Sequence, residues 1–321
     1  MPNLKGGLRY QIKNWPEYNK ALVQRGSLTI WVDNGAVQGW IEKNNSKKRG
    51  RPQYYSDEAI LMLLILREVY HLPLRGVQGM AESIFCLMGL SLPVPSYTQI
   101  CRRAQKLGKV LKPLQRKGKV DIVFDSTGLK VYGEGEWKVR SHGISKRRTW
   151  KKLHIGIDHS TQEILVCKLT GRDGGDSATG VKMLDEINGM PRQVLGDGGY
   201  DGGNFREAVE RLGAELITPP PRNATYKGAK EGWLKKRDTA LAEIQELGGD
   251  DDARDIWKRL VKYHRRSLVE TTMYRLKQIL EGNLKSRCNA NQEIEVQCKC
   301  IILNRMANLG LPEGEWIEVA A

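Results

Sequence analysis

The run AILMLLILREVY at residues 59–70 is too apolar for the surface helix of a globular protein and too short to span a bilayer. We therefore predict a buried core helix over residues 58–70. Ser56 and Asp57 can cap its start, and Pro73 ends it.

Two further helices are predicted downstream of the core helix. The first covers about residues 74–88. The second covers residues 97–107 and opens on Ser96 and Gln99, which have the spacing of a capping box. Because this last helix is polar and basic, the three helices predict a helix-turn-helix-like module that binds DNA. The alternative is an amphipathic helix with a solvated face.

Beyond Gly118, β-rich runs alternate with helical segments. The run VDIVFDSTGLKVYG predicts a hairpin whose first strand ends near Asp125, with a turn at residues 126–128. The elements expected after the first strands are a helix at 177–187, a strand at 193–195, a helix at 204–212 and a strand at 214–218. This order predicts an α/β sheet covered by helices.

Two aspartates follow short apolar runs. Asp125 follows Ile122 to Phe124, and Asp197 follows Val194 to Gly196 in the segment RQVLGDGGYDG. A carboxylate at the end of a strand points into a crevice, and the small residues around Asp197 allow close backbone approach. The alternative for either residue is a turn or helix-capping aspartate.

A third carboxylate, Glu270, lies in the predicted helix YHRRSLVETTMYRLK with Tyr263, Arg266 and Lys277. At roughly 100° per residue, the four side chains fall within an arc of about 60° on one side of the helix. Two cations and a phenol thus frame one carboxylate, which suits a metal ion beside a phosphodiester. The alternative is a solvated face in which Arg266 and Glu270 form an ordinary i,i+4 ion pair.

Together, the three carboxylates resemble the acidic triad of bacterial DDE transposases of the insertion sequence five family. The glutamate of that family lies in a Tyr-x2-Arg-x3-Glu-x6-Lys motif, and this chain matches it at Tyr263, Arg266, Glu270 and Lys277. The FDST segment at 124–127 and the GDGGYD segment at 196–201 are similar to the two aspartate motifs of the family. The resemblance covers most of the chain, is strongest over 121–287, and picks Asp197 rather than Asp201.

The resemblance implies an α/β fold with a ribonuclease H-like mixed sheet flanked by helices, preceded by a mainly helical DNA-binding domain. It implies that Asp125, Asp197 and Glu270 are catalytic and hold two Mg²⁺ ions, for which Mn²⁺ can substitute, with Asp125 bridging both. Tyr263, Arg266 and Lys277 would position the phosphates of the DNA end.

The implied function is that of an insertion-sequence transposase. Such a protein binds terminal inverted repeats, hydrolyses phosphodiesters with Mg²⁺ and transfers the freed strand to target DNA, working as a homodimer or larger assembly. Two alternatives remain open: a non-catalytic DNA-binding regulator derived from a transposase, and a metal-dependent nuclease that does not join strands.

Charge points to the same kind of partner. The 321 residues contain 52 Lys and Arg against 37 Asp and Glu, a net charge of +15 with a pI near 9.5. This balance favours a polyanion, with double-stranded DNA as the simplest choice. The segment SKKRGRP at 46–52 looks like an AT-hook, with a plain basic linker as the alternative. The DNA-binding candidates are Lys47, Lys48, Arg49 and Arg51 in this linker and Gln99, Arg102 and Arg103 in the third helix.

These features divide the chain into an N-terminal segment at 1–45, a helical DNA-binding domain with its basic linker at 46–118, and a catalytic domain at 119–321. Tryptophans 15, 31 and 40 of the N-terminal segment are expected to fill a core or a subunit contact. The catalytic domain carries an inserted charged segment at about 219–262. Its basic residues either contact DNA phosphates or form a solvated surface; they are Arg222, Lys227, Lys230, Lys235 and Lys236.

The remaining metal-ligand residue types show no zinc spacing. Cys298 and Cys300 are expected to be buried thiols, and His154 and Asp158, on one face of a predicted strand, are expected to belong to the scaffold. The sequence shows no signal peptide and no apolar stretch of membrane length. These features predict a cytoplasmic, nucleoid-associated bacterial protein with no membrane partner.

Overall fold

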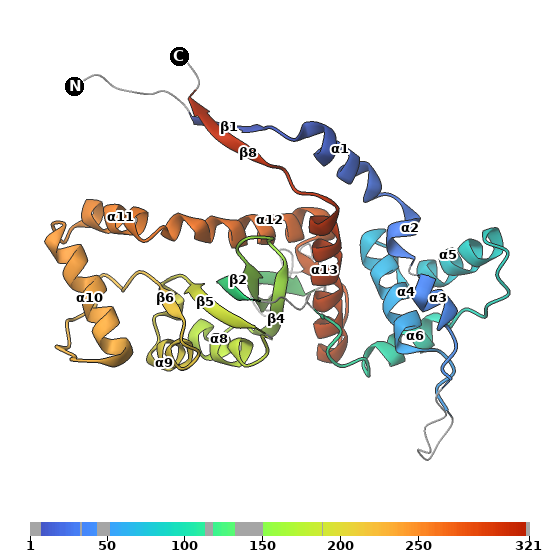
Figure 1. Cartoon of the computed structure of the whole chain (residues 1–321). Helices are drawn as coiled ribbons and strands as arrows, with labels where there is room; N and C mark the ends of the chain where they lie inside the picture. The colour runs from blue at the N-terminus through green and yellow to red at the C-terminus, as the bar shows by residue number, and fades with distance from the viewer. Residues whose placement is uncertain are drawn as a thin grey trace, which may run out of the picture.

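A six-stranded mixed sheet forms the centre of the protein (Figure 1). The computed structural model describes residues 8–32, 34–43, 52–112, 118–131, 150–187 and 189–318. The strands lie in the order β4-β3-β2-β5-β6, with β7 paired to the end of β2. Their bounds are Lys119–Val131 for β2, Trp150–Asp158 for β3, Ile164–Gly171 for β4, Met190–Leu195 for β5, Glu215–Ile217 for β6 and Asn283–Leu284 for β7.

The pairing directions confirm the expected ribonuclease H-like sheet. Strands β4, β3 and β2 are antiparallel to one another, whereas β2, β5 and β6 are parallel. Helix α8 (Asp176–Leu184) leads into β5, and α9 (Gly203–Arg211) connects β5 to β6. Such a helical connection is usual between parallel strands, which a tight turn cannot join. Three antiparallel strands continued by two parallel ones form the core of that fold.

Strand β2 is one continuous strand of 13 residues, so the predicted hairpin with a turn at 126–128 is wrong. Ser126, Thr127 and Gly128 pair with His154, Leu153 and Lys152 of β3. Glycine is tolerated in this ladder because the ring of Trp150 fills the place of its side chain: a Cβ on Gly128 would lie 3.3 Å from that ring. Asp125 therefore stands in the middle of a long strand rather than at its end.

Residues of β2 alternate between two covered faces. Val123 and Leu129 belong to the core shared with α12 (Ser267–Leu280) and α13 (Asn289–Leu309). Ile122 and Phe124 face a second core formed with α8 and α9. Asp125 thus belongs to the face of α12, and Ser126 to the face of α8.

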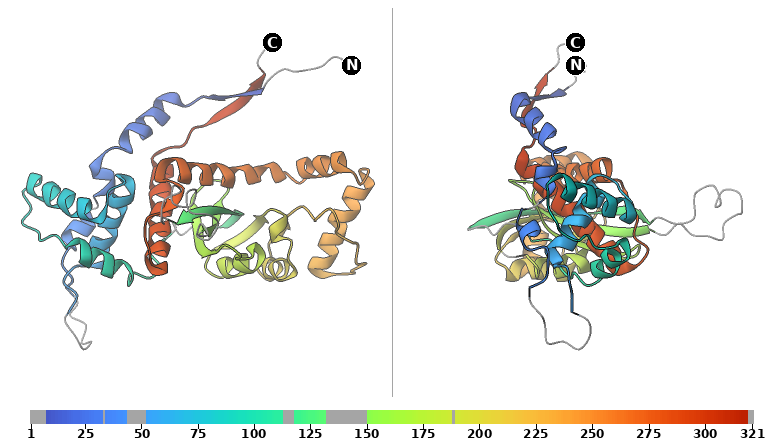
Figure 2. Two further views of the ribbon diagram at one scale, coloured as in Figure 1. Left: turned by 180° about the vertical axis from the view of Figure 1, so that it is seen from behind. Right: turned by 90° about the vertical axis from the view of Figure 1, so that its right-hand side faces the viewer.

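The helical region packs against α13, beside the sheet (Figures 1 and 2). Its helices are α4 (Asp57–Val69), α5 (Leu74–Leu87) and α6 (Tyr97–Ala104), close to the predicted bounds. The Ser56 side chain caps α4 by accepting from the Ala59 N–H at 3.1 Å, and Ser96 and Gln99 form the predicted capping box. Buried apolar side chains of these helices and of the α12 face form one contiguous core.

The N-terminal helices complete this region. They are α1 (Trp15–Gln24), α2 (Leu28–Trp31) and α3 (Asn34–Gln38). Trp31 and Trp40 are fully buried in the core, as expected, and donate to the backbone carbonyls of Arg25 and Pro93 at 2.8 and 2.7 Å. Trp15 is exposed.

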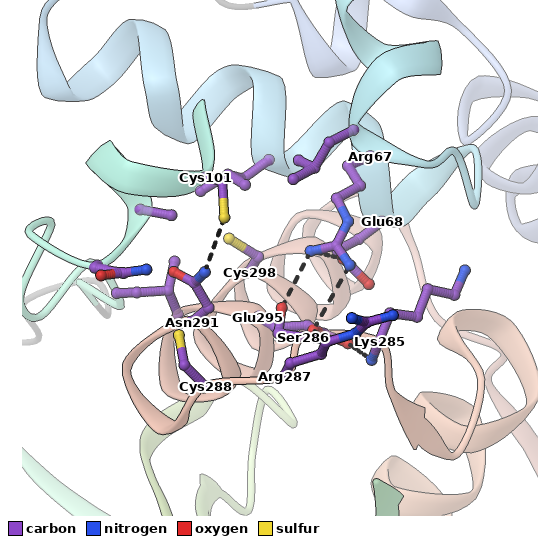
Figure 3. A pocket seen from close by; sticks show the side chains of 15 residues that line it. Arg67, Glu68, Cys101, Lys285, Ser286, Arg287, Cys288, Asn291, Glu295 and Cys298 are labelled. Atoms are coloured by element: carbon purple, nitrogen blue, oxygen red, sulfur yellow. Dashed lines mark hydrogen bonds and ion pairs between the residues drawn. The ribbon is translucent and has the colours of Figure 1, made fainter. Parts of the chain in front are cut away.

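A buried ionic cluster around Lys299 joins the helical region to the end of α12. Figure 3 shows its members Glu68 and Glu295 with Arg67 beside a cavity. Lys299 of α13 donates to the carbonyls of Leu280 and Asn283 at 2.7 Å each and lies 3.9 Å from carboxylate oxygens of both Glu68 and Glu295. Glu295 also accepts from the backbone N–H groups of residues 285 and 286. A cavity of about 360 Å³ opens beside this cluster, lined by α4, α6 and α13.

Two peripheral units complete the chain. Helices α10 (Gly232–Glu246) and α11 (Asp251–Leu260) form the inserted charged segment and pack on each other around Trp257. Strands β1 (Leu8–Ile12) and β8 (Gly314–Glu318) pair as an antiparallel ribbon that stands away from the sheet (Figure 2). Among the described residues, no helix combines the length and hydropathy needed to cross a membrane.

Candidate active site

The guanidinium of Arg266 lies between two of the three candidate carboxylates. It donates to Asp125 Oδ2 at 2.8 Å and, through its other terminal nitrogen, to Glu270 Oε1. Asp125 comes from β2 and Glu270 from the first turn of α12, so the arginine links the sheet to the helix that crosses it. The Glu270 side chain is 53% exposed, whereas the Asp125 side chain is only 11% exposed.

Asp197 is the third carboxylate in this neighbourhood. It follows β5, and its Oδ1 accepts from the Gly199 N–H at 2.9 Å, which starts the 3-10 turn η1 (Gly198–Tyr200). Thr218 at the end of β6 donates to the Asp197 carbonyl at 2.7 Å and fixes the turn. The alternative carboxylate, Asp201, is turned to other partners, since it forms ion pairs with Arg206 and Arg237.

Burial and mutual repulsion act together on these carboxylates. Burial raises the pKa of Asp125, and the charges of Asp197 and Glu270 raise it further against the Ser126 N–H and Arg266, which lower it. Three negative groups therefore share a space in which one cation, Arg266, compensates them.

Tyr263 lies at the same place, although its backbone is not part of the α-helix. Residues Tyr263–Arg266 form a 3-10 turn, η2, and α12 begins at Ser267, so the single predicted helix is two helical elements. The ring of Tyr263 still stacks near the Arg266 guanidinium, 5.9 Å from its centroid. Burial raises the pKa of Tyr263 to about 12, so its hydroxyl stays protonated at neutral pH and can donate a hydrogen bond.

The turn η2 is held over the sheet by its neighbour Arg265. This side chain donates to Asp121 Oδ2 at 3.2 Å and to Gln193 Oε1 at 2.6 Å, on β2 and β5. Asp121 also accepts from Arg192 at 2.8 Å. Lys277, the last residue of the sequence motif, lies two turns beyond Glu270 on α12 and is half-buried beside Gly282.

The carboxylates have the chemistry of a divalent cation site, but not its open arrangement. Within the part of the chain that the structure describes, no three Asp, Glu, His or Cys side chains form a group ready to hold a metal ion. At this site, Asp125 and Glu270 already form ion pairs with Arg266. Oxygen donors suit Mg²⁺ and Mn²⁺, and a cation would relieve the repulsion that raises the pKa of Asp125. The residues therefore fit the implied metal once the guanidinium leaves them.

Sequence reasoning missed one charged residue beside the site. Asp176, at the start of α8, accepts from Lys152 Nζ at 2.8 Å, and its Oδ1 lies 3.2 Å from His154 Nδ1. Burial would raise the pKa of Asp176, but hydrogen bonds from His154, Lys152 and Ser126 lower it well below its usual value. Its only sequence signal is an acidic residue at a helix start, which is common there.

His154 is buried in the scaffold as predicted, and it contacts Asp176 rather than Asp158. Asp158 instead accepts from the backbone N–H and side chain of Ser160. Cys298 and Cys300 are buried free thiols, as expected.

The candidate DNA-contacting residues have different surroundings. Lys47, Lys48, Arg49 and Arg51 lie outside the described residues. Arg103 donates to the Tyr55 carbonyl and to Asp57 and is only 12% exposed, so its contact with DNA stays a prediction. The Gln99 side-chain oxygen is likewise engaged by Ser96 in the capping box. Arg102 is exposed on α6.

Sequence comparisons relate this chain to transposases. The sequence model of one Transposase DDE domain family matches residues 116–305, more than half of the chain, and a second such model matches residues 23–134. An uncharacterized protein of Aquifex aeolicus is 23% identical over 288 residues, covering 84% of this chain and 79% of that protein.

Solved transposase structures are more distant. The Drosophila P element transposase strand transfer complex is 12% identical, covers 80% of this chain and 66% of that chain, and has a TM-score of 0.31. The Mos1 transposase paired-end complex with the left transposon end is 11% identical, covers 74% and 82%, and has a TM-score of 0.23. These scores add nothing to the argument from sheet topology, which rests on the strand order itself. The match across residues 116–305 shows that the chain belongs to the DDE transposase family.

Proposed function

We propose that the protein is an insertion-sequence transposase that cuts and joins DNA at a site formed by Asp125, Asp197 and Glu270. The observation that carries this proposal is the meeting of these three carboxylates, from β2, the end of β5 and α12, around a single arginine. A DNA-binding regulator has no use for such a group, because carboxylates on its surface repel a phosphate backbone.

Each carboxylate has a role that follows from its position. Asp125, the most buried of the three, would hold two Mg²⁺ or Mn²⁺ ions between Asp197 and Glu270, each of which would hold one. Cations held there supply Lewis-acid stabilisation of the charge that develops on the phosphate oxygens.

The basic and phenolic side chains would then hold the DNA. Arg266, released from Asp125 and Glu270, presents a guanidinium fork that fits a phosphate, and the protonated Tyr263 donates a hydrogen bond to a phosphate oxygen. Lys277 adds a charge contact two turns further along α12.

Two phosphoryl transfers make up the proposed reaction. In the first, water attacks the phosphorus at the element end, the P–O3′ bond breaks, and a 3′-hydroxyl and a 5′-phosphate result. In the second, that hydroxyl attacks a target phosphodiester, forming a new P–O3′ bond as the target strand releases its own 3′-hydroxyl. The DNA partners are the terminal inverted repeats and the target, and two ends require a dimer or larger assembly on the nucleoid.

The test uses a supercoiled plasmid that carries the coding sequence with the DNA flanking it on both sides. Purified protein is incubated with this plasmid and Mg²⁺, and the nicked, excised and joined products are resolved. The wild type is expected to cleave in the flanking DNA and to join ends. Glu270→Gln is expected to do neither, whereas Glu207→Gln, an exposed glutamate of α9, is expected to act like the wild type.

Other outcomes identify the alternatives. DNA binding without metal-dependent cleavage by the wild type would establish the regulator. Cleavage without joined products would establish a simple nuclease.

A further inference from the structure

A fourth carboxylate lies beneath the proposed site, on the opposite face of the sheet. Asp176 starts α8, whereas Asp125 and Glu270 belong to the α12 face. Lys152 and His154 of β3 engage its two oxygens, and His154, which is fully buried, also contacts the Thr170 hydroxyl through Nε2 at 2.9 Å. The carboxylate is therefore fixed in one orientation and is ionised at neutral pH.

Its contacts reach the segment that carries Asp125. Ser126 follows Asp125 directly, and its side chain lies against the Asp176 carboxylate, where it helps to lower the pKa of Asp176. Ser126 also pairs across the ladder with His154, so both residues stand on the α8 face. The Ser126 N–H donates to Asp125 Oδ1 at 2.8 Å, which links the held serine to the carboxylate on the other face.

Asp176 also lies against the turn that carries Asp197. A Cβ placed on Gly199 would be 2.9 Å from Asp176 Oδ2 and 3.0 Å from Asp197 Oδ1, so both carboxylates lie directly against this glycine. The same glycine donates its N–H to Asp197. Asp176 thus lies against both segments that carry the aspartates of the site: it lies beside Ser126, next to Asp125, and beside Gly199, in the turn that follows Asp197.

We propose that Asp176 is a positioning residue of the cation site: supported by Lys152 and His154, it sets the orientation of Asp125 and Asp197 from the far face of the sheet. This inference rests on the proposed function. Asp176 is not itself a ligand, because it lies on the opposite face of the sheet and Lys152 holds its Oδ2. It also adds a fixed negative charge below the cations, which favours their binding.

Cation affinity separates this role from a purely structural one. The full-length protein is titrated with Mn²⁺ by calorimetry, and cleavage of the supercoiled plasmid is followed as a function of Mg²⁺ concentration. Asp176→Asn is expected to weaken Mn²⁺ binding by about 10- to 100-fold, as loss of a residue that orients ligands does. Its cleavage is expected to recover at high Mg²⁺. Asp173→Asn, an exposed aspartate three residues upstream, is the matched control and should leave both unchanged.

The outcomes distinguish this inference from the function on which it rests. If the wild type neither binds Mn²⁺ nor cleaves DNA, the proposed function fails and the inference with it. If the wild type does both and Asp176→Asn binds Mn²⁺ equally well, only the inference fails. Should Asp176→Asn not fold by circular dichroism, Ser126→Ala decides: it removes only the hydroxyl that lies against Asp176, and unchanged Mn²⁺ affinity in this variant overturns the inference.

Discussion

Arg266 donates to Asp125 at 2.8 Å while its other terminal nitrogen engages Glu270, one turn further along the same helical run. This single side chain compensates two carboxylates that would otherwise repel each other across the junction of β2 and α12. A divalent cation at the proposed site would compete with this guanidinium for the same oxygens.

Replacing Arg266 therefore separates metal binding from catalysis. Arg266→Met is expected to bind Mn²⁺ more tightly than the wild type, because the internal competitor is gone. Its single-turnover cleavage rate is expected to fall by about 100-fold or more, as when a donor to the reacting phosphate is lost. Calorimetric titration and plasmid cleavage measure the two effects, with Arg259→Met, an exposed arginine of α11, as the control. Weaker Mn²⁺ binding in Arg266→Met would show that the arginine supports the cation site instead of competing for it.

Addition of a divalent cation is expected to raise the melting temperature of the wild type. A cation that binds only the folded state at 100 times its dissociation constant stabilises it by about 2.7 kcal/mol. Asp125→Asn should lose this dependence, because it removes the most buried ligand and its charge. Thermal melting with Mg²⁺, and again after chelation, measures the effect. An equal rise in both proteins would place the cation elsewhere.

The packing beneath the site predicts a stability difference between two glycines. A Cβ on Gly156 would lie 2.7 Å from the Phe124 ring and 3.0 Å from Val166, whereas one on Gly171 would meet nothing within 4 Å. Gly156→Ala is expected to lower the free energy of unfolding by about 1–3 kcal/mol, the usual effect of overpacking. Gly171→Ala should change it little. Urea denaturation compares the two, and equal effects would mean that the Phe124 ring can yield.

Stability is also expected to depend on pH through Glu68. Burial, followed by the charge of Glu295, raises the pKa of Glu68 to about 7, against the opposing charges of Arg67, Lys299 and Lys285. Between pH 4.5 and about 7, the folded state holds a proton that the unfolded state has released. The contribution of Glu68 to the free energy of unfolding is therefore fully present below pH 4.5 and is lost as the pH rises to about 7. Glu68→Gln should flatten this part of the profile, as measured by urea denaturation across the range. An unchanged slope in the variant would assign the dependence to another group.

Much of the fold could be predicted from local pattern. The apolar run of α4, its Ser56 cap and the Ser96 capping box are signals within a few residues of each other, and all three appear in the structure. From residue 177 to residue 218, the predicted alternation of helices and strands likewise matches α8, β5, α9 and β6. Glu270 and its neighbours were found because their spacing is regular, even though the first four residues of the run form a 3-10 turn.

The errors fall where distant residues decide the outcome. Residues 126–128 resemble a turn, but pairing with β3 and the ring of Trp150 keep them in a strand. The contacts of Arg103 with Tyr55 and Asp57, nearly fifty residues earlier in the chain, likewise have no local signal. Asp176 looks like an ordinary helix start, and only the folded sheet brings it to Ser126 and Gly199.

The ionic cluster around Lys299 has a mechanical consequence. Its ammonium group binds the carbonyls at the end of α12 and lies close to Glu68 of α4, while a single apolar core runs through both regions. The helical region proposed to bind DNA and the sheet proposed to carry the active site are therefore packed together at this contact and are not hinged there. If α6 binds a DNA end, the distance between the bound recognition sequence and the active site is fixed. Cleavage should then be lost when base pairs are inserted or deleted between the recognition sequence and the cleavage point.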